Sequence, residues 1–252
     1  ASCESVDVII HASGLNAQEC IENPKKALLV NGVYTQNLVK AAVNQSVKKI
    51  IYLSTAHVYH QNLNNIITEE TPTINTHPYA TSHVAGEDAI LNTNKDAKIE
   101  GLVCRIANIF GSPVNKTVNC WMLLVNDLCK QAVVEKSLKL NSNSEVVRDF
   151  VTSQDFCSAI KFLIEKKVKG NVINIGSGKS STIGEMASRI QTNCLSVLGF
   201  KPPIVFKNKS SAMKNILDYQ TNYLNNAGFK FINDFDEEIK DLIRFCVKNK
   251  DQ

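Results

Sequence analysis

The chain has 252 residues, of which 44% are hydrophobic and 21% are charged, and these ordinary proportions exclude the disordered and fibrous classes. This length allows one large domain or two small ones with a sizeable core. The net charge of +4 is too weak at this length to indicate a nucleic-acid partner, and no apolar run reaches the roughly 18 residues that a membrane span needs.

The eight cysteines contain no C-x-x-C pair, and most of them lie inside apolar runs. Cysteines of this kind are typical of buried free thiols in a reducing compartment. The first residues also lack the basic-then-apolar pattern of a secretion signal. We therefore expect a cytoplasmic protein that does not contact a membrane.

Strands and helices alternate through the first half of the chain. The nearly unbroken β-branched run at residues 6–12 predicts a strand that is covered on both faces, as in a parallel sheet. Further strands are expected at 49–54 and 102–106, and helices at 23–44 and 78–91. This alternation predicts an α/β fold with a doubly wound parallel sheet.

The second half mixes shorter elements, which is typical of a smaller α+β lobe attached to the sheet. Thr182 and Glu185 form a capping box at the start of a helix, and the acidic run 234–238 is more simply a helix N-terminus than a metal site. The other helices are expected at 121–134, 155–165, 221–227 and 236–247, the strands at 138–140, 171–175 and 202–206, and a polar loop at 60–76.

The usual phosphate-binding turn of a dinucleotide-binding sheet is missing from the sequence. Such a sheet opens with a strand, a G-x-G-x-x-G turn and a helix. The chain has only 11 glycines, and the nearest cluster, Gly176-x-Gly178, comes late and lacks the third glycine. We expect either a fragment or a protein that has lost this turn. In both cases the first strand would be a sheet edge, open to pairing with another chain.

Two hydroxyl side chains are placed at one edge of the predicted sheet. Thr55 ends the second strand, and Tyr79 opens the helix that follows the polar loop. Ligands of an open α/β sheet bind beyond the carboxyl ends of its strands. We therefore expect Thr55 and Tyr79 to meet over one cleft, although Tyr79 alone is also compatible with an ordinary residue of an amphipathic helix.

Seven segments, in the same order along the chain, resemble the extended short-chain dehydrogenase/reductase family. The similarity is greatest to its NAD-dependent sugar-nucleotide epimerases, dehydratases and 4-keto reductases. Each segment is weak evidence alone, but together, and with a similar tail segment at 218–229, they are spread across nearly the whole chain. The segments are DVIIHA (7–12), NGVYTQNL (31–38), YLSTAHVY (52–59), YATSH (79–83, followed by Gly86-Glu87), RIANIFG (105–111), RDFV (148–151, with Asp155) and NIGSG (174–178).

The resemblance implies an incomplete Rossmann-like sheet and hydride transfer between a nicotinamide, of NAD or NADP, and a sugar carbon. It implies Tyr79 as the acid/base and Thr55 as the hydroxyl partner on the same sugar oxygen. The other implied positions are Ala12, Ser13, Asn31, Ser54, Tyr79 and His83 for the cofactor, and Asn108 and Arg148 for the nucleotide-sugar substrate. Arginine suits a diphosphate because its fork donates parallel hydrogen bonds, but Arg148 is equally compatible with a salt-bridged surface residue.

The resemblance also implies a division of the chain into two lobes. Residues 1–112 would be the remnant of the dinucleotide-binding domain, completed by about 149–178. Residues 113–252 would form mainly the substrate-binding lobe. A homodimer through the helices at 23–44 and 78–91 would follow the family's habit, by analogy only.

The chain departs from the family at His83, where the family has a lysine that lowers the pKa of the tyrosine and holds the nicotinamide ribose. The i, i+4 spacing keeps His83 on the Tyr79 face of the helix. A free histidine, with a pKa of about 6.5, is mostly neutral at pH 7. A unit charge ~5 Å from the phenol, at an effective dielectric constant of ~20, is worth about 3 kcal/mol, or roughly two pKa units. We expect hydride chemistry to be impaired, and His83 to be either a retained ribose contact or a surface residue of a decayed site.

Two functions remain open from the sequence. The first is an NAD(P)-dependent epimerase or 4-keto reductase acting on a nucleotide sugar, since Ala56-His57 stands where the family's dehydratases have an Asp-Glu pair. The second is a catalytically inactive relative that binds a nucleotide sugar or a protein partner. His11 and His57 are interpreted as structural residues beside strand ends.

Overall fold

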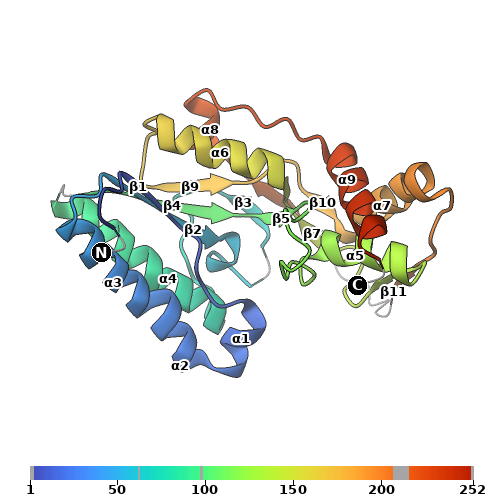
Figure 1. Ribbon diagram of the computed structural model, residues 1–252, viewed down its shortest axis with the longest axis horizontal. Coiled ribbons are helices and arrows are strands. Elements are labelled where there is room, and N and C mark those ends of the chain that lie inside the picture. Colours follow the sequence, from blue (N-terminus) through green and yellow to red (C-terminus); the bar gives the residue numbers. More distant parts are fainter. Residues whose placement is uncertain (1–2, 62, 97–98, 207–215, 251–252) are drawn as a thin grey trace.

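The computed structural model describes residues 3–61, 63–96, 99–206 and 216–250. Its centre is a four-stranded parallel sheet in the order β1-β2-β4-β9 (Figure 1). The predicted α/β class with a parallel sheet is confirmed. The strands are β1 (Val8–His11), β2 (Lys49–Thr55), β4 (Glu100–Ile106) and β9 (Val172–Ile175).

Helices cover both faces of this sheet. In Figure 1, α3 (Tyr34–Asn44) and α4 (Pro78–Leu91) lie below it, and α6 (Ser153–Glu165) lies above it. Since side chains alternate along a strand, Ile50 packs in the core between the sheet and helices α3 and α4, whereas Ile51 packs in the core between the sheet and α6. Burial on both faces explains the continuous apolar runs of β2 and β4. The expectation that the first strand is covered on both faces was wrong, because β1 lies at the edge of the sheet and Ile10 is 46% exposed.

The segment predicted as one helix at residues 23–44 is helical but interrupted. It consists of α2 (Pro24–Ala27), a π-helical turn η1 (Leu28–Val33) and α3, and α1 (Ala17–Glu22) precedes it. Asn23 ends α1 and caps α2, with Pro24 in the first position of α2. The π turn cannot be read from apolar spacing, because its one extra residue leaves most of that spacing intact.

The second lobe is built around three helices, α5 (Leu124–Val134), α7 (Ile183–Leu198) and α9 (Phe235–Lys248), which share one core. Thr182 and Glu185 form the predicted capping box of α7, and Asp234 caps α9, so the acidic run is a helix N-terminus as expected. The other elements are η2 (Ala56–Val58), η3 (Asn92–Asp96), β3 (Asn65–Ile67), β5 (Asn108–Phe110), β6 (Leu138–Leu140), β7 (Val147–Arg148), β8 (Phe150–Thr152), β10 (Ser181–Thr182), β11 (Ile204–Phe206), β12 (Leu217–Tyr219) and α8 (Asn222–Asn226).

Several local predictions were wrong in detail. The loop expected at 60–76 contains β3, which pairs in parallel with β12. The helix expected at 121–134 begins only at Leu124. The short strands β7 and β8 were not predicted, because two or three residues are too few to show a period and their pairing partners lie far along the chain.

A buried ion pair fixes α4 on the sheet. Arg105, on β4, donates from Nη2 to Glu87 Oε2 of α4 at 2.6 Å, and its Nε lies 3.1 and 3.2 Å from the two carboxylate oxygens. Ser54, on β2, donates its hydroxyl to Glu87 Oε1 at 2.5 Å. The Glu87 side chain is 2% exposed and that of Arg105 8% exposed, so the pair is almost fully desolvated. It therefore ties the helix to two neighbouring strands at once.

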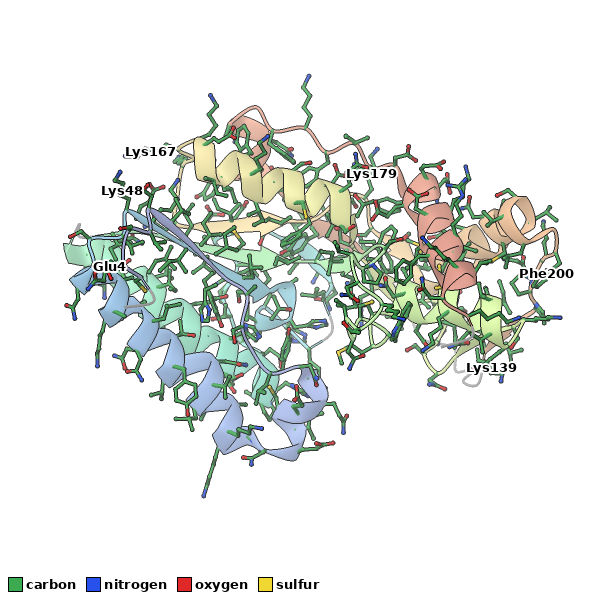
Figure 2. The ribbon with its side chains drawn as sticks, viewed as in Figure 1. Glu4, Lys48, Lys139, Lys167, Lys179 and Phe200 are labelled. Carbon is green, nitrogen blue, oxygen red and sulfur yellow. The ribbon has the colours of Figure 1, made fainter. Side chains whose placement is uncertain are left out.

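Replacing Glu87 by glutamine tests this constraint. Because Glu87→Gln leaves the Arg105 charge buried without a counterion, we expect the free energy of unfolding to fall by about 3 kcal/mol in urea denaturation. The matched control is Glu135→Gln, which breaks an exposed pair with Lys139 at the outside of the molecule (Figure 2) and should change stability by less than about 1 kcal/mol. Equal losses in the two variants would contradict the anchoring role of Glu87.

Candidate active site

A cleft of about 360 Å³ opens at the carboxyl ends of β1, β2 and β4, the edge at which open α/β sheets bind ligands. The loop after β1 forms one wall, the first turns of α4 a second, and the segment after β4 a third. The lining residues are Ala12, Ser13, Gly14, Leu15, Asn16, Leu53, Ser54, Thr55, His57, Tyr79, His83, Ile106, Ala107, Asn108, Ile109 and Leu123.

Most of the side chains singled out from the sequence meet at this cleft. Asn31 and Arg148 are the exceptions, since neither belongs to the lining. Ser54 lines the wall, but its hydroxyl proton is donated to Glu87, so this hydroxyl holds the strand end to α4. His57, interpreted as structural from the sequence, is part of the lining.

Thr55 and Tyr79 are brought together by the ends of β2 and α4. Thr55 is the last residue of β2, and its Oγ1 accepts a hydrogen bond from His57 N at 3.2 Å. Tyr79 lies in the first turn of α4, where His77 Nδ1 caps its backbone N–H at 3.2 Å. Burial raises the pKa of the Tyr79 phenol, and the nearby Thr55 side chain partly opposes that rise. The two side chains therefore line the same part of the cleft.

Two imidazole rings flank Tyr79 edge-on. The His83 ring centroid lies 4.6 Å from that of Tyr79, and the His57 centroid lies 6.5 Å away on a different element. Burial lowers the pKa of each histidine to about 4, and nearby positive charge, from Arg148 and His77 for His57 and from His11 for His83, adds to the effect. Both rings are thus neutral at pH 7, and neither stabilises a phenolate as a lysine cation would.

His83 rests on a buried tyrosine that the sequence did not single out. Its Nδ1 lies 3.0 Å from the hydroxyl of Tyr52, which is 1% exposed. This contact requires glycine at position 86, because a β-carbon there would come within 2.5 Å of the Tyr52 oxygen and 2.6 Å of the Asn31 carbonyl oxygen. The only sequence signals were the inclusion of Tyr52 and Gly86 in matching segments.

Asn31 holds the loop after β1 against α4. Its side-chain Oδ1 accepts from Leu15 N at 2.8 Å, and its Nδ2 donates to Ser82 Oγ at 3.0 Å. Ser82 in turn donates to the carbonyl oxygen of Tyr79 at 3.0 Å. Asn31 is fully buried in η1, so it supports the cleft wall from behind. Its contact with a cofactor stays a prediction.

Asn108, on β5, lines the cleft, whereas Arg148, on β7, lies outside the lining. Asn108 donates from both its backbone N and its Nδ2 to the carbonyl oxygen of Asp149, at 3.1 and 3.0 Å. Arg148 is half-buried and has no carboxylate partner among the described residues; its guanidinium donates only to Val147 O, at 3.1 Å. Burial lowers the pKa of Arg148, and its charge acts on His57 in the cleft wall. A desolvated cation without a counterion is suited to an anionic ligand.

Two further properties limit the site. Within the ranges that the structure describes, no three His, Cys, Asp or Glu side chains gather in a way that could hold a metal ion. Among those same residues, no helix combines the length and apolar character needed to cross a membrane.

The family is shown by comparison with known proteins. The model of the NAD dependent epimerase/dehydratase family matches residues 1–176, so the chain belongs to this family. It is 29% identical over 191 residues to a UDP-glucose 4-epimerase of Mycoplasma genitalium, covering 68% of this chain and 56% of that protein. It is 25% identical over 219 residues to the human dTDP-D-glucose 4,6-dehydratase, covering 86% and 58%. The chain thus spans little more than half the length of these two relatives.

The same fold occurs in RMD from Pseudomonas aeruginosa, solved in complex with NADPH. The superposition has a TM-score of 0.81 at 23% identity and covers 96% of this chain and 82% of that one. The recognition of the family from its seven segments is therefore confirmed, and so is the Rossmann-like class of the sheet.

Replacing His83 by lysine tests the electrostatic description of Tyr79. In the unaltered protein the phenol should ionise above the value of about 10 for free tyrosine, because burial raises its pKa. A lysine cation about 5 Å away should lower that pKa by roughly two units. Ultraviolet difference titration against Tyr79→Phe isolates the signal, and His83→Gln is the uncharged control. Ionisation of Tyr79 below pH 10 in the unaltered protein would refute this description.

Proposed function

We propose that the protein is an NAD(P)-dependent epimerase or 4-keto reductase acting on a nucleotide sugar. The observation that carries the proposal is that Thr55 and Tyr79 line the same cleft at the strand ends. A phenol and a hydroxyl on one cleft wall can both hydrogen-bond one sugar oxygen. The curated relatives, which include a UDP-glucose 4-epimerase and a dTDP-glucose dehydratase, support a nucleotide sugar as the substrate class.

Tyr79 would move the proton of the reaction. When a sugar carbonyl is reduced, the Tyr79 O–H gives its proton to the carbonyl oxygen, while Thr55 holds that oxygen by a hydrogen bond; in the reverse direction a phenolate takes the hydroxyl proton back. The bound nicotinamide cofactor supplies or accepts the hydride. Because burial raises the pKa of Tyr79, the resting site holds the protonated phenol. This state favours the reductase direction, since it is the acid that carbonyl reduction needs.

The wall formed by the loop after β1 fits a nicotinamide ring. Ala12, Ser13 and Gly14 are small, and a β-carbon on Gly14 would come within 3.2 Å of Asn31 Oδ1, so the loop lies close to its support and leaves the cleft open. His83 faces the same space from α4. These residues would hold the nicotinamide and its ribose.

The nucleotide sugar would extend from the cleft towards the second lobe. Arg148, whose guanidinium has no carboxylate partner among the described residues, would bind the diphosphate bidentately, and Asn108 would contact the sugar. We also propose a division of the chain, with residues 1–112, completed by about 149–178, forming the cofactor side and 113–252 mainly the substrate side. Asn108 would reach the sugar from the cofactor side. We also propose a cytoplasmic location, which fits a nucleotide-sugar substrate.

A catalytically inactive binding protein is the second candidate. It is favoured by one observation, the neutral His83 beside a tyrosine whose pKa is raised. Such a protein would bind the nucleotide sugar through Arg148 without turnover. Calorimetry and an activity assay on the same sample separate the two candidates.

Replacing Tyr79 by phenylalanine tests the catalytic proposal. We expect the rate of NAD(P)H oxidation with a nucleotide 4-ketosugar, or of epimerisation, to fall by about 10²–10⁴-fold, because the proton donor is lost. The affinity for the nucleotide sugar, measured by calorimetry, should change little. The control is Tyr223→Phe on α8, which does not belong to the cleft lining. Equal rates in the two variants would exclude Tyr79 as the acid, and binding without turnover in the unaltered protein would support the inactive alternative.

A homodimer is proposed through the helices below the sheet. Three apolar side chains of η1, Leu28, Leu29 and Val33, and Tyr34 at the start of α3 are 41–53% exposed. An apolar surface of this kind is typical of an interface between copies.

Replacing Val33 by glutamate should dissociate such a dimer, because it places a charge in the apolar surface. Light scattering after gel filtration should show a dimer for the unaltered protein and a monomer for Val33→Glu. Val247→Glu, at a position of similar exposure (47% against 46%) on α9, is the matched control. A monomeric unaltered protein would contradict the proposal.

A further inference from the structure

The hydroxyl of Tyr52 has one hydrogen-bond partner among the described residues. That partner is His83 Nδ1, at 3.0 Å. The hydroxyl lies under α4, packed against Gly86, and Tyr52 is 1% exposed. A buried hydroxyl hydrogen without an acceptor is costly, so the Tyr52 proton has to point at His83 Nδ1.

This requirement fixes the tautomer of His83. A neutral imidazole carries one proton, and a nitrogen that accepts a hydrogen bond cannot carry it. The His83 ring is neutral at pH 7, because burial lowers its pKa to about 4. With Nδ1 accepting from Tyr52, the ring proton must lie on Nε2.

The Nε2 side of the ring faces the cleft. Nδ1 is directed into the core at Tyr52, while His83 itself lines the cleft. The ring carbon Cε1, between the two nitrogens, lies 3.8 Å from the position that a β-carbon on Gly14 would take. Nε2 has no hydrogen-bond partner among the described residues, so its N–H is free to donate to a ligand.

We propose that Tyr52 is a positioning residue that locks His83 as the Nε2–H tautomer, so that the cleft presents a neutral hydrogen-bond donor to a ribose hydroxyl of the cofactor. The proposal rests on the proposed function for the identity of the ligand, but not for the tautomer. A second consequence is that His83 cannot remove the proton of Tyr79, because one nitrogen is already protonated and the other is occupied. Tyr79 then exchanges its proton with the substrate or solvent.

A second histidine provides an internal reference. Thr35 donates its hydroxyl proton to Asn31 O at 2.7 Å, so its oxygen can only accept from His11 Nε2, at 2.8 Å. His11 is therefore also expected as the Nε2–H tautomer, but it is held by Thr35 and not by Tyr52.

The tautomers can be read in the free protein by nitrogen-15 NMR of labelled histidine. The chain has five histidines, and His83→Gln assigns the His83 signals. We expect a protonated Nε2 and an unprotonated Nδ1 for His83, a mixture of tautomers in Tyr52→Phe, and no change at His11. The control is Tyr59→Phe, which removes an equally buried hydroxyl bonded to Asn174 Oδ1. A protonated Nδ1 in the unaltered protein overturns the proposal, and this reading stands even if Tyr52→Phe does not fold.

Binding of NADH and NADPH tests the role of the donor. Tyr52→Phe should raise the Kd by the reciprocal of the Nε2–H fraction in that variant, about twofold for an equal mixture, and Tyr59→Phe should leave the Kd unchanged. In a His83→Gln background, Tyr52→Phe should have no further effect, because an amide donor has no tautomer to lose. A loss that persists in that background would mean that Tyr52 acts only through packing. If the unaltered protein binds neither dinucleotide, the proposed function and the ribose role both fail, while the spectra still decide the tautomer.

Discussion

The buried ion pair between Glu87 and Arg105 sets the geometry on which the site depends. Tyr79, His83 and Glu87 are spaced by four residues and therefore share one face of α4. With Glu87 held by Arg105 of β4 and Ser54 of β2, both the rotation of α4 about its axis and its distance from the sheet are fixed. That position places the phenol and the imidazole over the strand ends. An apolar contact in place of the ion pair would fix the distance but leave the rotation less determined, since it has no direction.

The charge distribution around Tyr79 follows from the same packing. The two rings beside it come from different elements, and both lose their charge because they are enclosed by protein. Arg148 is a cation close enough to the cleft wall for its charge to lower the pKa of His57. The Arg148 cation is thus suited to an anionic ligand, whereas the two rings beside the Tyr79 phenol carry no charge at pH 7. A site of this kind keeps the tyrosine as an acid.

Residues behind the cleft hold its lining in place by hydrogen bonds and close contacts. Asn31 connects the loop after β1 to α4 by hydrogen bonds to residues 16 and 51 positions away. Glycine at position 86 leaves room for the Tyr52 hydroxyl that hydrogen-bonds to His83. Asn31 and Gly86 both lie outside the cleft lining, and each supports residues that line it. Asn31 and Gly86 both belong to segments that resemble the family. The resemblance did not show whether they support the cleft wall or contact a ligand directly.

The sequence by itself determined the parallel sheet, the ends of α4, the capping box of α7 and the meeting of Thr55 with Tyr79. Each of these follows from local rules: continuous apolar runs, capping residues and the position of strand ends. Only the tertiary structure decided the π turn of η1, the lowered pKa values of His57 and His83, the lack of a carboxylate partner for Arg148 among the described residues, and the bond from Tyr52. These depend on desolvation and on partners far apart in the chain, and such contacts leave no period or spacing in the sequence.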